Sequence, residues 1–279
     1  MQRPGALYHR TGHPRGRGAV PVSVNGYEFL RVSTAEGIAT VALNRPPLNI
    51  LHSPMMAELD RALEAILASA DTAALVIRAE GKAFCAGVDV AEHTVERVGE
   101  MIRLFHGLFR KLAACDALTI AVVQGAALGG GCELACSCDI VLAADSARFG
   151  QPEVQVGAFP PVAACVLPHQ VGLRKAVELT ALGTTIDAAE ARRIGLVSQV
   201  FAAAELNERV EQYLEQVGRL SRPVLRMAKR ATTLAAREQI LAQLERVERM
   251  YLTELMSLAD AHEGVQAFLH KRPPAWKHA

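Results

Sequence analysis

Apolar and polar residues alternate along this chain with two different periods between residues 27 and 200. Short apolar runs bounded by turn residues are typical of strands, and they occur at residues 30–33, 38–43, 74–77, 119–123 and 140–143. Between them, apolar residues recur every three or four positions, as expected of amphipathic helices. Strands that alternate with helices in this order favour an α/β fold, with parallel strands and helices packed outside them.

Turn and capping residues define several boundaries. Glu36-Gly37 separates two strand-like runs and predicts a hairpin, and residues 44–47 (Asn-Arg-Pro-Pro) end the second strand. Ser53-Pro54 combines a capping residue with a proline in the first turn, which predicts a helix start. Residues 98–114 are predicted to form another helix, and residues 80–87 a loop.

The pattern becomes almost entirely helical after Phe201. An apolar stripe in this segment must cover either the core of the same chain or another subunit; it contains Ile240, Leu244, Val247, Met250, Tyr251 and Leu255. We therefore predict three parts: a disordered basic tail over residues 1–22, a core over 23–200, and a C-terminal helical oligomerisation subdomain over 201–279.

Composition narrows the possible functions. The chain has 279 residues, 51% of them hydrophobic, and a net charge of +1, so neither nucleic acid nor a membrane is indicated as a partner. Residues 1–20 are basic and rich in Gly and Pro, and they lack the apolar region of a secretory signal. An RNA-binding arm is the alternative for this tail, but Tyr8 is its one aromatic residue.

Six cysteines show no spacing typical of a disulfide framework, so we expect reduced thiols in a cytoplasmic protein. Cys132, Cys136 and Cys138 suggest a metal site at first sight. Residues i and i+4 share a helix face, but i+6 points elsewhere and no histidine is near. We predict buried thiols, no metal and no bound cofactor. A dinucleotide site is not expected either, because the glycine run at 129–131 lacks the later glycine of that fingerprint.

The candidate chemistry lies in two segments. Residues 125–135 form a glycine-rich turn that opens a helix containing Glu133, and Glu153 follows a short strand in a loop. Such a turn offers free amide N–H groups and the positive end of a helix dipole, where an oxyanion can bind. Two nearby carboxylates could transfer protons to and from a substrate. The structural alternative is that Glu133 caps a helix and Glu153 pairs with an arginine.

Separated motifs in the expected order resemble the crotonase (enoyl-CoA hydratase/isomerase) superfamily. They lie at residues 44–46, 81–89, 121–157, 196–197 and 263–272. The resemblance implies a crotonase-like spiral of ββα units with a C-terminal helical subdomain. It also implies a homotrimer or dimer of trimers, and an acyl-CoA thioester as substrate, with coenzyme A present only as part of that substrate.

The resemblance also assigns roles by position. The backbone N–H groups of Val88 and Gly130 would form an oxyanion hole for the thioester carbonyl. Glu133 and Glu153 match the two glutamates of the hydratases, with Glu133 as water activator and Glu153 as proton donor to Cα. This implies a hydratase that adds water across a double bond conjugated to the thioester. An isomerase, a decarboxylase or a thioester hydrolase on the same fold is the alternative.

The chain departs from the common hydratase pattern after Glu153. Residues 160–164 read Pro-Pro-Val-Ala-Ala where a Pro-Gly-Ala-Gly-Gly turn is usual, so the acyl pocket should be narrower. With residues 45–50 and 86–93, this stretch looks like the cyclohexa-1,5-dienecarbonyl-CoA hydratase branch, which serves aromatic degradation; a linear enoyl-CoA of fatty acid metabolism remains open. Predicted substrate contacts are Ala86, His93, Phe159, Pro161 and Val162. Lys271 is predicted to bind CoA, with Arg272 as the alternative.

Overall fold

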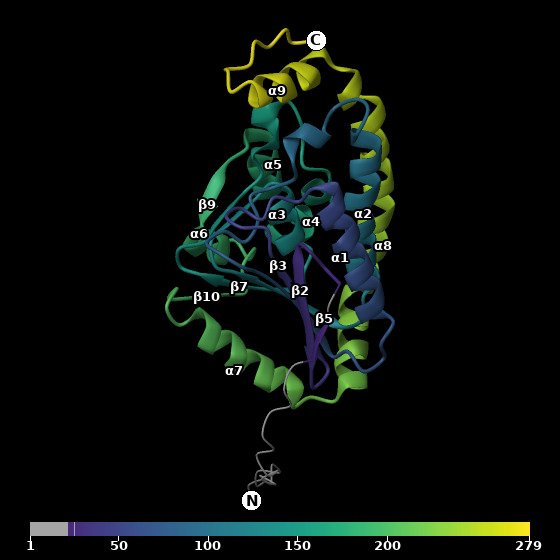
Figure 1. Cartoon of the computed structure of the whole chain (residues 1–279), viewed down its shortest axis with the longest axis vertical. Coiled ribbons are helices and arrows are strands. Elements are labelled where there is room, and N and C mark those ends of the chain that lie inside the picture. The colour runs from purple at the N-terminus through teal and green to yellow at the C-terminus, as the bar shows by residue number, and fades with distance from the viewer. Residues whose placement is uncertain (1–21, 25) are drawn as a thin grey trace, which may run out of the picture.

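The computed structural model describes residues 22–24 and 26–279 (Figure 1). The disordered tail predicted for residues 1–22 therefore falls outside the described residues, apart from Val22, which begins the first strand. None of the helices in the described part of the chain is both long and apolar enough to cross a bilayer.

A seven-stranded sheet forms the centre of the fold, in the order β1-β2-β3-β4-β5-β7-β10. Its strands are β1 (Val22–Val24), β2 (Leu30–Ala35), β3 (Ile38–Leu43), β4 (Ala74–Ala79), β5 (Leu118–Val123), β7 (Ile140–Ala144) and β10 (Gln199–Phe201). The pairing from β3 to β10 is parallel, as predicted, and β2 and β3 form the predicted antiparallel hairpin.

A smaller sheet lies beside the glycine-rich turn. It consists of β6 (Ala126–Leu128), β8 (Arg148–Gly150) and β9 (Thr185–Asp187). Strand β6 pairs in parallel with β8, so the segment that leads to Glu133 and the segment that leads to Glu153 run side by side. This pairing brings together two carboxylates that are twenty positions apart in the sequence.

The large sheet is buried on both faces, as parallel sheets usually are. Alternate residues, such as Val76, Ile120 and Leu142, pack against one side of helix α7 (Leu206–Gly218). The residues between them, such as Ile77 and Val141, belong to the main core under the other helices. Figure 1 shows α7 apart from α1, α2 and α8, which lie together on the opposite side of the strands.

The remaining helical segments surround this main core. They are α1 (Ser53–Leu67), η1 (Val90–Glu92), α2 (Val98–Ala114), α3 (Gly130–Cys136), η2 (Pro152–Val156), α4 (Pro161–Val171), α5 (Leu173–Leu182), α6 (Ala188–Arg193), α8 (Arg222–Thr253), η3 (Leu255–Ser257) and α9 (Ala259–Leu269). The helix predicted to start at Ser53 and the helix predicted over residues 98–114 are confirmed, but Ser53 is the first helical residue and not the cap, because His52 occupies the N-cap position.

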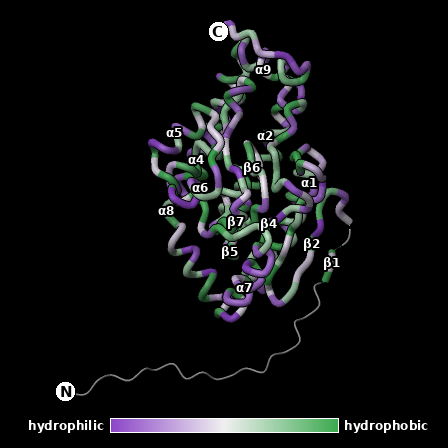
Figure 2. Tube along the Cα trace, turned by 90° about the vertical axis from the view of Figure 1, so that its left-hand side faces the viewer, coloured by the Kyte–Doolittle hydropathy of each residue, from purple (hydrophilic) through white to green (hydrophobic). Residues whose placement is uncertain are grey.

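Helix α8 carries most of the predicted C-terminal stripe. Leu244 and Tyr251 are buried in the main core, and Ile240, Val247 and Leu255 are partly buried against it, so the stripe covers the core of its own chain. Met250 is wrongly placed in the stripe, because it is 48% exposed, one position from the face that Tyr251 occupies. Hydrophobic and hydrophilic segments alternate along α8 in Figure 2, as expected of a helix with one buried face.

Helix α9 packs closely against η2, at the end of the molecule where the chain terminates (Figure 1). Two glycines permit this contact. A Cβ at Gly264 would lie 2.3 Å from the Val156 carbonyl oxygen, and Gly157 has a φ of +73° and faces the Asp260 carbonyl oxygen. The C-terminal helix is thereby held against the segment that contains Glu153.

Candidate active site

A cavity of about 370 Å³ lies where α2, α3, η2, α8 and α9 meet. Its lining includes most of the residues predicted from the sequence to form the site: Ala86, Val88, His93, Gly130, Glu133, Glu153, Phe159 and Pro161. Val162 and Lys271 do not line this cavity, although the Val162 amide donates a hydrogen bond to Glu133. The structure thus assembles the other predicted residues in one place, while their roles stay predictions.

Val88 and Gly130 both line this cavity, and the backbone amide of each has no hydrogen-bond partner among the described residues. Leu51 pairs with the chain on either side of Val88, since its N–H donates to Gly87 O at 2.9 Å and its carbonyl accepts from Asp89 N at 2.8 Å. This pairing leaves the Val88 amide free. Gly130 begins α3, where no preceding turn can accept its N–H.

Glu133 lies in the first turn of α3, as predicted, and is 2% exposed. Its Oε1 accepts hydrogen bonds from Val162 N at 2.7 Å and Ala163 N at 2.8 Å, in the first turn of α4. Glu133 therefore does cap a helix, but it caps α4 instead of its own helix. Burial raises the pKa of Glu133 to about 7, and the two amide hydrogen bonds limit that rise.

Glu153 belongs to the 3₁₀ helix η2, which corrects the prediction that it lies in a loop. The cause is Pro152, whose fixed φ suits the first turn of a helix. Glu153 is half-buried as a residue, but its Oε2 is buried and has no hydrogen-bond partner among the described residues. The predicted alternative, an arginine partner, is therefore wrong. Burial, followed by the charge of Glu133, holds the pKa of Glu153 well above its ordinary value.

Aromatic and aliphatic side chains form the rest of the wall. The rings of Phe159 and Tyr251 meet edge to face, with centroids 5.1 Å apart at 62°. Phe105 contacts the turn at Gly130, and Val265 and Phe268 of α9 complete the enclosure. Phe105, Tyr251, Val265 and Phe268 were not among the residues predicted for the site, because they come from helices that lie far apart in the sequence. Of these residues, Tyr251 alone had a sequence signal, which was its position in the apolar stripe of α8.

His93 follows η1 and lines the same cavity. Its Nδ1 lies 3.1 Å from the Asp89 carbonyl oxygen, and because a carbonyl can only accept, this nitrogen carries the hydrogen. Burial lowers the pKa of His93, so the ring is neutral near pH 7. Its Nε2 is then an acceptor.

The two candidate CoA-binding cations differ in their surroundings. Arg272 forms an ion pair with Glu263 through both of its terminal nitrogens, and this pair lowers the pKa of Glu263 to about 2. Lys271 is exposed just after α9, and its ammonium pairs with no described side chain. Of the two, Lys271 is the cation available to a phosphate.

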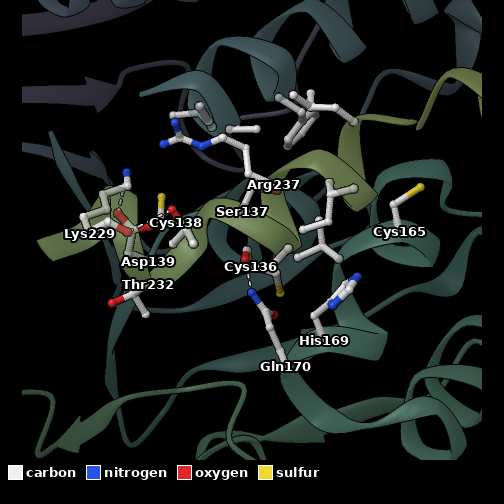
Figure 3. A pocket seen from close by; sticks show the side chains of 18 of the residues that line it. Cys136, Ser137, Cys138, Asp139, Cys165, His169, Gln170, Lys229, Thr232 and Arg237 are labelled. Carbon is white, nitrogen blue, oxygen red and sulfur yellow. Dashed lines mark hydrogen bonds and ion pairs between the residues drawn. The ribbon is translucent and has the colours of Figure 1, made fainter. Parts of the chain in front are cut away.

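A second and larger cavity, of about 490 Å³, lies between α2, α4 and α8 (Figure 3). Its ionic groups are paired. Lys229 contacts Asp139 at 2.7 Å and donates to Ala117 O at 2.7 Å, and Asp139 also accepts from the amide and hydroxyl of Thr119. Arg237 is bound to Asp116 and to Cys115 O. Figure 3 shows Lys229 and Asp139 directed at one another.

The three clustered cysteines are buried thiols, as predicted. Cys132 and Cys136 share a face of α3 with sulfurs 3.7 Å apart, while Cys138 contacts the Leu134 carbonyl oxygen. Within residues 22–24 and 26–279, no cluster of three or more His, Cys, Asp or Glu side chains has the arrangement of a metal site.

Comparison with known proteins identifies the class to which this fold and site belong. Residues 33–279 match the family described as Enoyl-CoA hydratase/isomerase. The chain therefore belongs to this family, and the predictions of a crotonase-like fold and of a hydratase-type enzyme are confirmed.

Individual relatives give more detail. The chain is 38% identical to the cyclohexa-1,5-dienecarbonyl-CoA hydratase of Thauera aromatica, over 84% of this chain and 91% of that protein. It is 40% identical to a probable enoyl-CoA hydratase of Rhizobium meliloti (strain 1021), over 90% and 99% of the two chains. A crystal structure of an enoyl-CoA hydratase from Mycobacterium avium subsp. paratuberculosis K-10 superimposes with a TM-score of 0.82 at 28% identity, covering 90% of this chain and 100% of that one.

Proposed function

We propose that this protein is an acyl-CoA hydratase that adds water across a double bond conjugated to a CoA thioester. One observation carries the proposal: the carboxylates of Glu133 and Glu153 share a cavity with the unpaired backbone amides of Val88 and Gly130. The amides of Val88 and Gly130 would bind the thioester oxygen as it gains negative charge. Such preorganised donors are each worth about 3–4 kcal/mol to a developing oxyanion.

Both glutamates have raised pKa values: burial raises that of Glu133 to about 7, and burial, followed by the charge of Glu133, raises that of Glu153 well above its ordinary value. Both can therefore exchange protons closer to neutral pH than an ordinary glutamate, and by the family resemblance we take Glu133 as the base and Glu153 as the acid. For a 2-enoyl thioester, Glu133 takes a proton from water while the water oxygen bonds to Cβ. The π electrons move to the thioester oxygen as an enolate, and the enolate carbon then takes the proton of Glu153.

Recovery of the starting state then needs one proton to pass from Glu133 to Glu153. Because the two carboxylates interact, this return is an internal transfer between neighbours. The step uses side chains and amides of this chain, and coenzyme A enters as part of the substrate. Lys271 is the proposed contact for a CoA phosphate, because Arg272 is engaged with Glu263.

A flat cyclic dienoyl group is the proposed acyl group. The name of the Thauera aromatica relative supports it, and so does the edge-to-face pair of Phe159 and Tyr251, beside Pro161 at the start of α4. A rigid ring can lie along such a wall without losing rotational freedom. By the same family resemblance we propose a cytoplasmic homotrimer or dimer of trimers.

An isomerase, a decarboxylase or a hydrolase could use the same oxyanion hole. An isomerase moves one proton within the substrate, and one carboxylate can serve it. Two carboxylates in one cavity, both with raised pKa values, suit a reaction that takes a proton from water and delivers another to carbon. Retention of both glutamates therefore favours hydration.

The test is a panel of three thioesters: crotonyl-CoA, a longer 2-enoyl-CoA and cyclohexa-1,5-diene-1-carbonyl-CoA. We expect hydration of at least one, with kcat/KM highest for the cyclic thioester. Faster turnover of a linear substrate would leave the hydratase proposal intact and contradict the cyclic acyl group. No hydration of any of the three would overturn the hydratase proposal and favour isomerase, decarboxylase or hydrolase chemistry.

A further inference from the structure

One tyrosine that lines this cavity has a hydroxyl without a partner in the described part of the chain. Tyr251 lies near the end of α8, is 2% exposed and lines the cavity beside Glu153. Its hydroxyl makes no hydrogen bond to any residue in the described part of the chain. Because the hydroxyl opens to the cavity and is not used within the chain, it is available to a molecule that enters the cavity.

The ring that carries this hydroxyl is held in place. It packs edge to face on Phe159 and belongs to the main hydrophobic core, so it cannot turn away to find another partner. Burial, followed by the charges of Glu153 and Glu133, raises the pKa of Tyr251. The hydroxyl therefore keeps its hydrogen near neutral pH, and it is a donor in the cavity that Glu133 and Glu153 also line.

A water molecule between the two glutamates lacks one contact. Buried waters make about three hydrogen bonds. Water can donate one hydrogen to Glu133 and the other to the carbonyl oxygen of protonated Glu153. These two bonds leave both lone pairs of the water oxygen without a partner, and an attacking water needs one of them directed at Cβ.

We propose that Tyr251 is a third catalytic residue, whose hydroxyl donates a hydrogen bond to the water that is added to the substrate. With two hydrogens and one lone pair bound, a tetrahedral oxygen has one lone pair left, and its direction is fixed. Orientation of this kind is a large part of catalysis when two molecules must react. The proposal rests on the hydratase function proposed above and deepens it.

The test is Tyr251→Phe, which removes one oxygen atom and keeps the ring packed on Phe159. We expect kcat for hydration to fall by roughly 10- to 100-fold with KM nearly unchanged. A second measurement separates this role from a structural one. The exchange of Cα hydrogens of butyryl-CoA in D2O needs the oxyanion hole and a carboxylate but no attacking water, so the variant should exchange at the native rate.

The matched control is Tyr213→Phe, because Tyr213 is half-buried against the other face of the sheet, away from the cavity. It should change neither rate. If Tyr251→Phe hydrates as fast as the native enzyme, or loses exchange and hydration equally, this proposal is overturned while the hydratase proposal stands. A native enzyme that hydrates no member of the panel overturns both.

Discussion

Two cavities of this protein differ in how their polar groups are paired, and this difference does not follow their volumes. The one between α2, α4 and α8 is the larger, at about 490 Å³ against about 370 Å³. Yet its charged groups are paired, with Asp139 bound to Lys229 and Arg237 bound to Asp116. In the smaller cavity, the amides of Val88 and Gly130, the hydroxyl of Tyr251 and one oxygen of Glu153 have no partner in the described part of the chain.

The difference indicates how stability and function are divided. Paired polar groups lower the free energy of the folded chain relative to groups left unpaired, whereas an unpaired buried group costs about 1–3 kcal/mol. That cost is recovered when a substrate supplies the missing partner. Carboxylates in the two cavities should therefore respond in opposite ways to the same chemical change.

The largest expected effect is that of Glu153→Gln on catalysis. The amide cannot deliver a proton to carbon, so kcat for hydration should fall by about 10³-fold, within the range of general acid catalysis. The substitution removes a buried group whose pKa is raised by burial, so Tm should not fall. Steady-state kinetics and a thermal melt on the same preparation check both statements.

Asp139→Asn is the matched change in the other cavity. It leaves the Lys229 ammonium, whose side chain is 5% exposed, without its counterion. Removing one partner of a buried pair costs about 3–5 kcal/mol, so Tm should fall by several degrees. The kcat of the folded variant should stay within about twofold of native. A large loss of kcat in this variant would contradict the division between the two cavities.

A smaller effect is expected from a single methyl group in the oxyanion hole. In Gly130→Ala the added Cβ would lie 2.6 Å from Val88 Cγ2 and 3.0 Å from Phe105 Cζ, so the turn or the Val88 loop must shift. Both proposed amide donors would move, and hydration should slow by about 10- to 100-fold. Gly99→Ala is the control, since a Cβ there meets nothing within 4 Å. Equal rates for the two variants would argue against a hole at Val88 and Gly130.

Local sequence signals predicted the parts of the fold that depend on neighbours along the chain. The Glu36-Gly37 hairpin, the Ser53 helix start and the glycine turn before Glu133 follow from a few adjacent residues. The hydrogen bonds from the first turn of α4 to Glu133 could not be predicted in this way, because the two donors lie 29 and 30 residues away in the sequence.

The aromatic side chains that line the smaller cavity could not be predicted as a group from the sequence either. An apolar helical stripe predicts that Tyr251 faces inward. It does not predict that α8 lines the smaller cavity or that the Tyr251 ring packs against Phe159 there. Met250 was misplaced for the same reason, since one position along a helix turns the side chain by about 100°. Contacts between distant segments depend on the orientation in which a long helix packs against the core. The residues of one helix do not determine that orientation, so the predicted grouping of site residues came mostly from the family resemblance.

The smallest and most specific effect concerns the pH dependence of stability in Glu133→Gln. In the native protein the pKa of Glu133 is about 7, above the 4.5 of an ordinary glutamate, so the folded state holds this proton to higher pH than the unfolded chain does. Folding is therefore unaffected below pH 4.5 and is penalised increasingly up to pH 7, by roughly 3 kcal/mol in all. Glutamine has no charge to bury, and its oxygen can still accept from the Val162 and Ala163 amides. Melts at pH 4.5 and pH 8 should show equal Tm values at the lower pH and a Tm higher by about 5 °C for the variant at the higher. A difference of the same size at both pH values would mean that Glu133 is ionised in the folded protein across this range, and its assignment as the base with a raised pKa would be wrong.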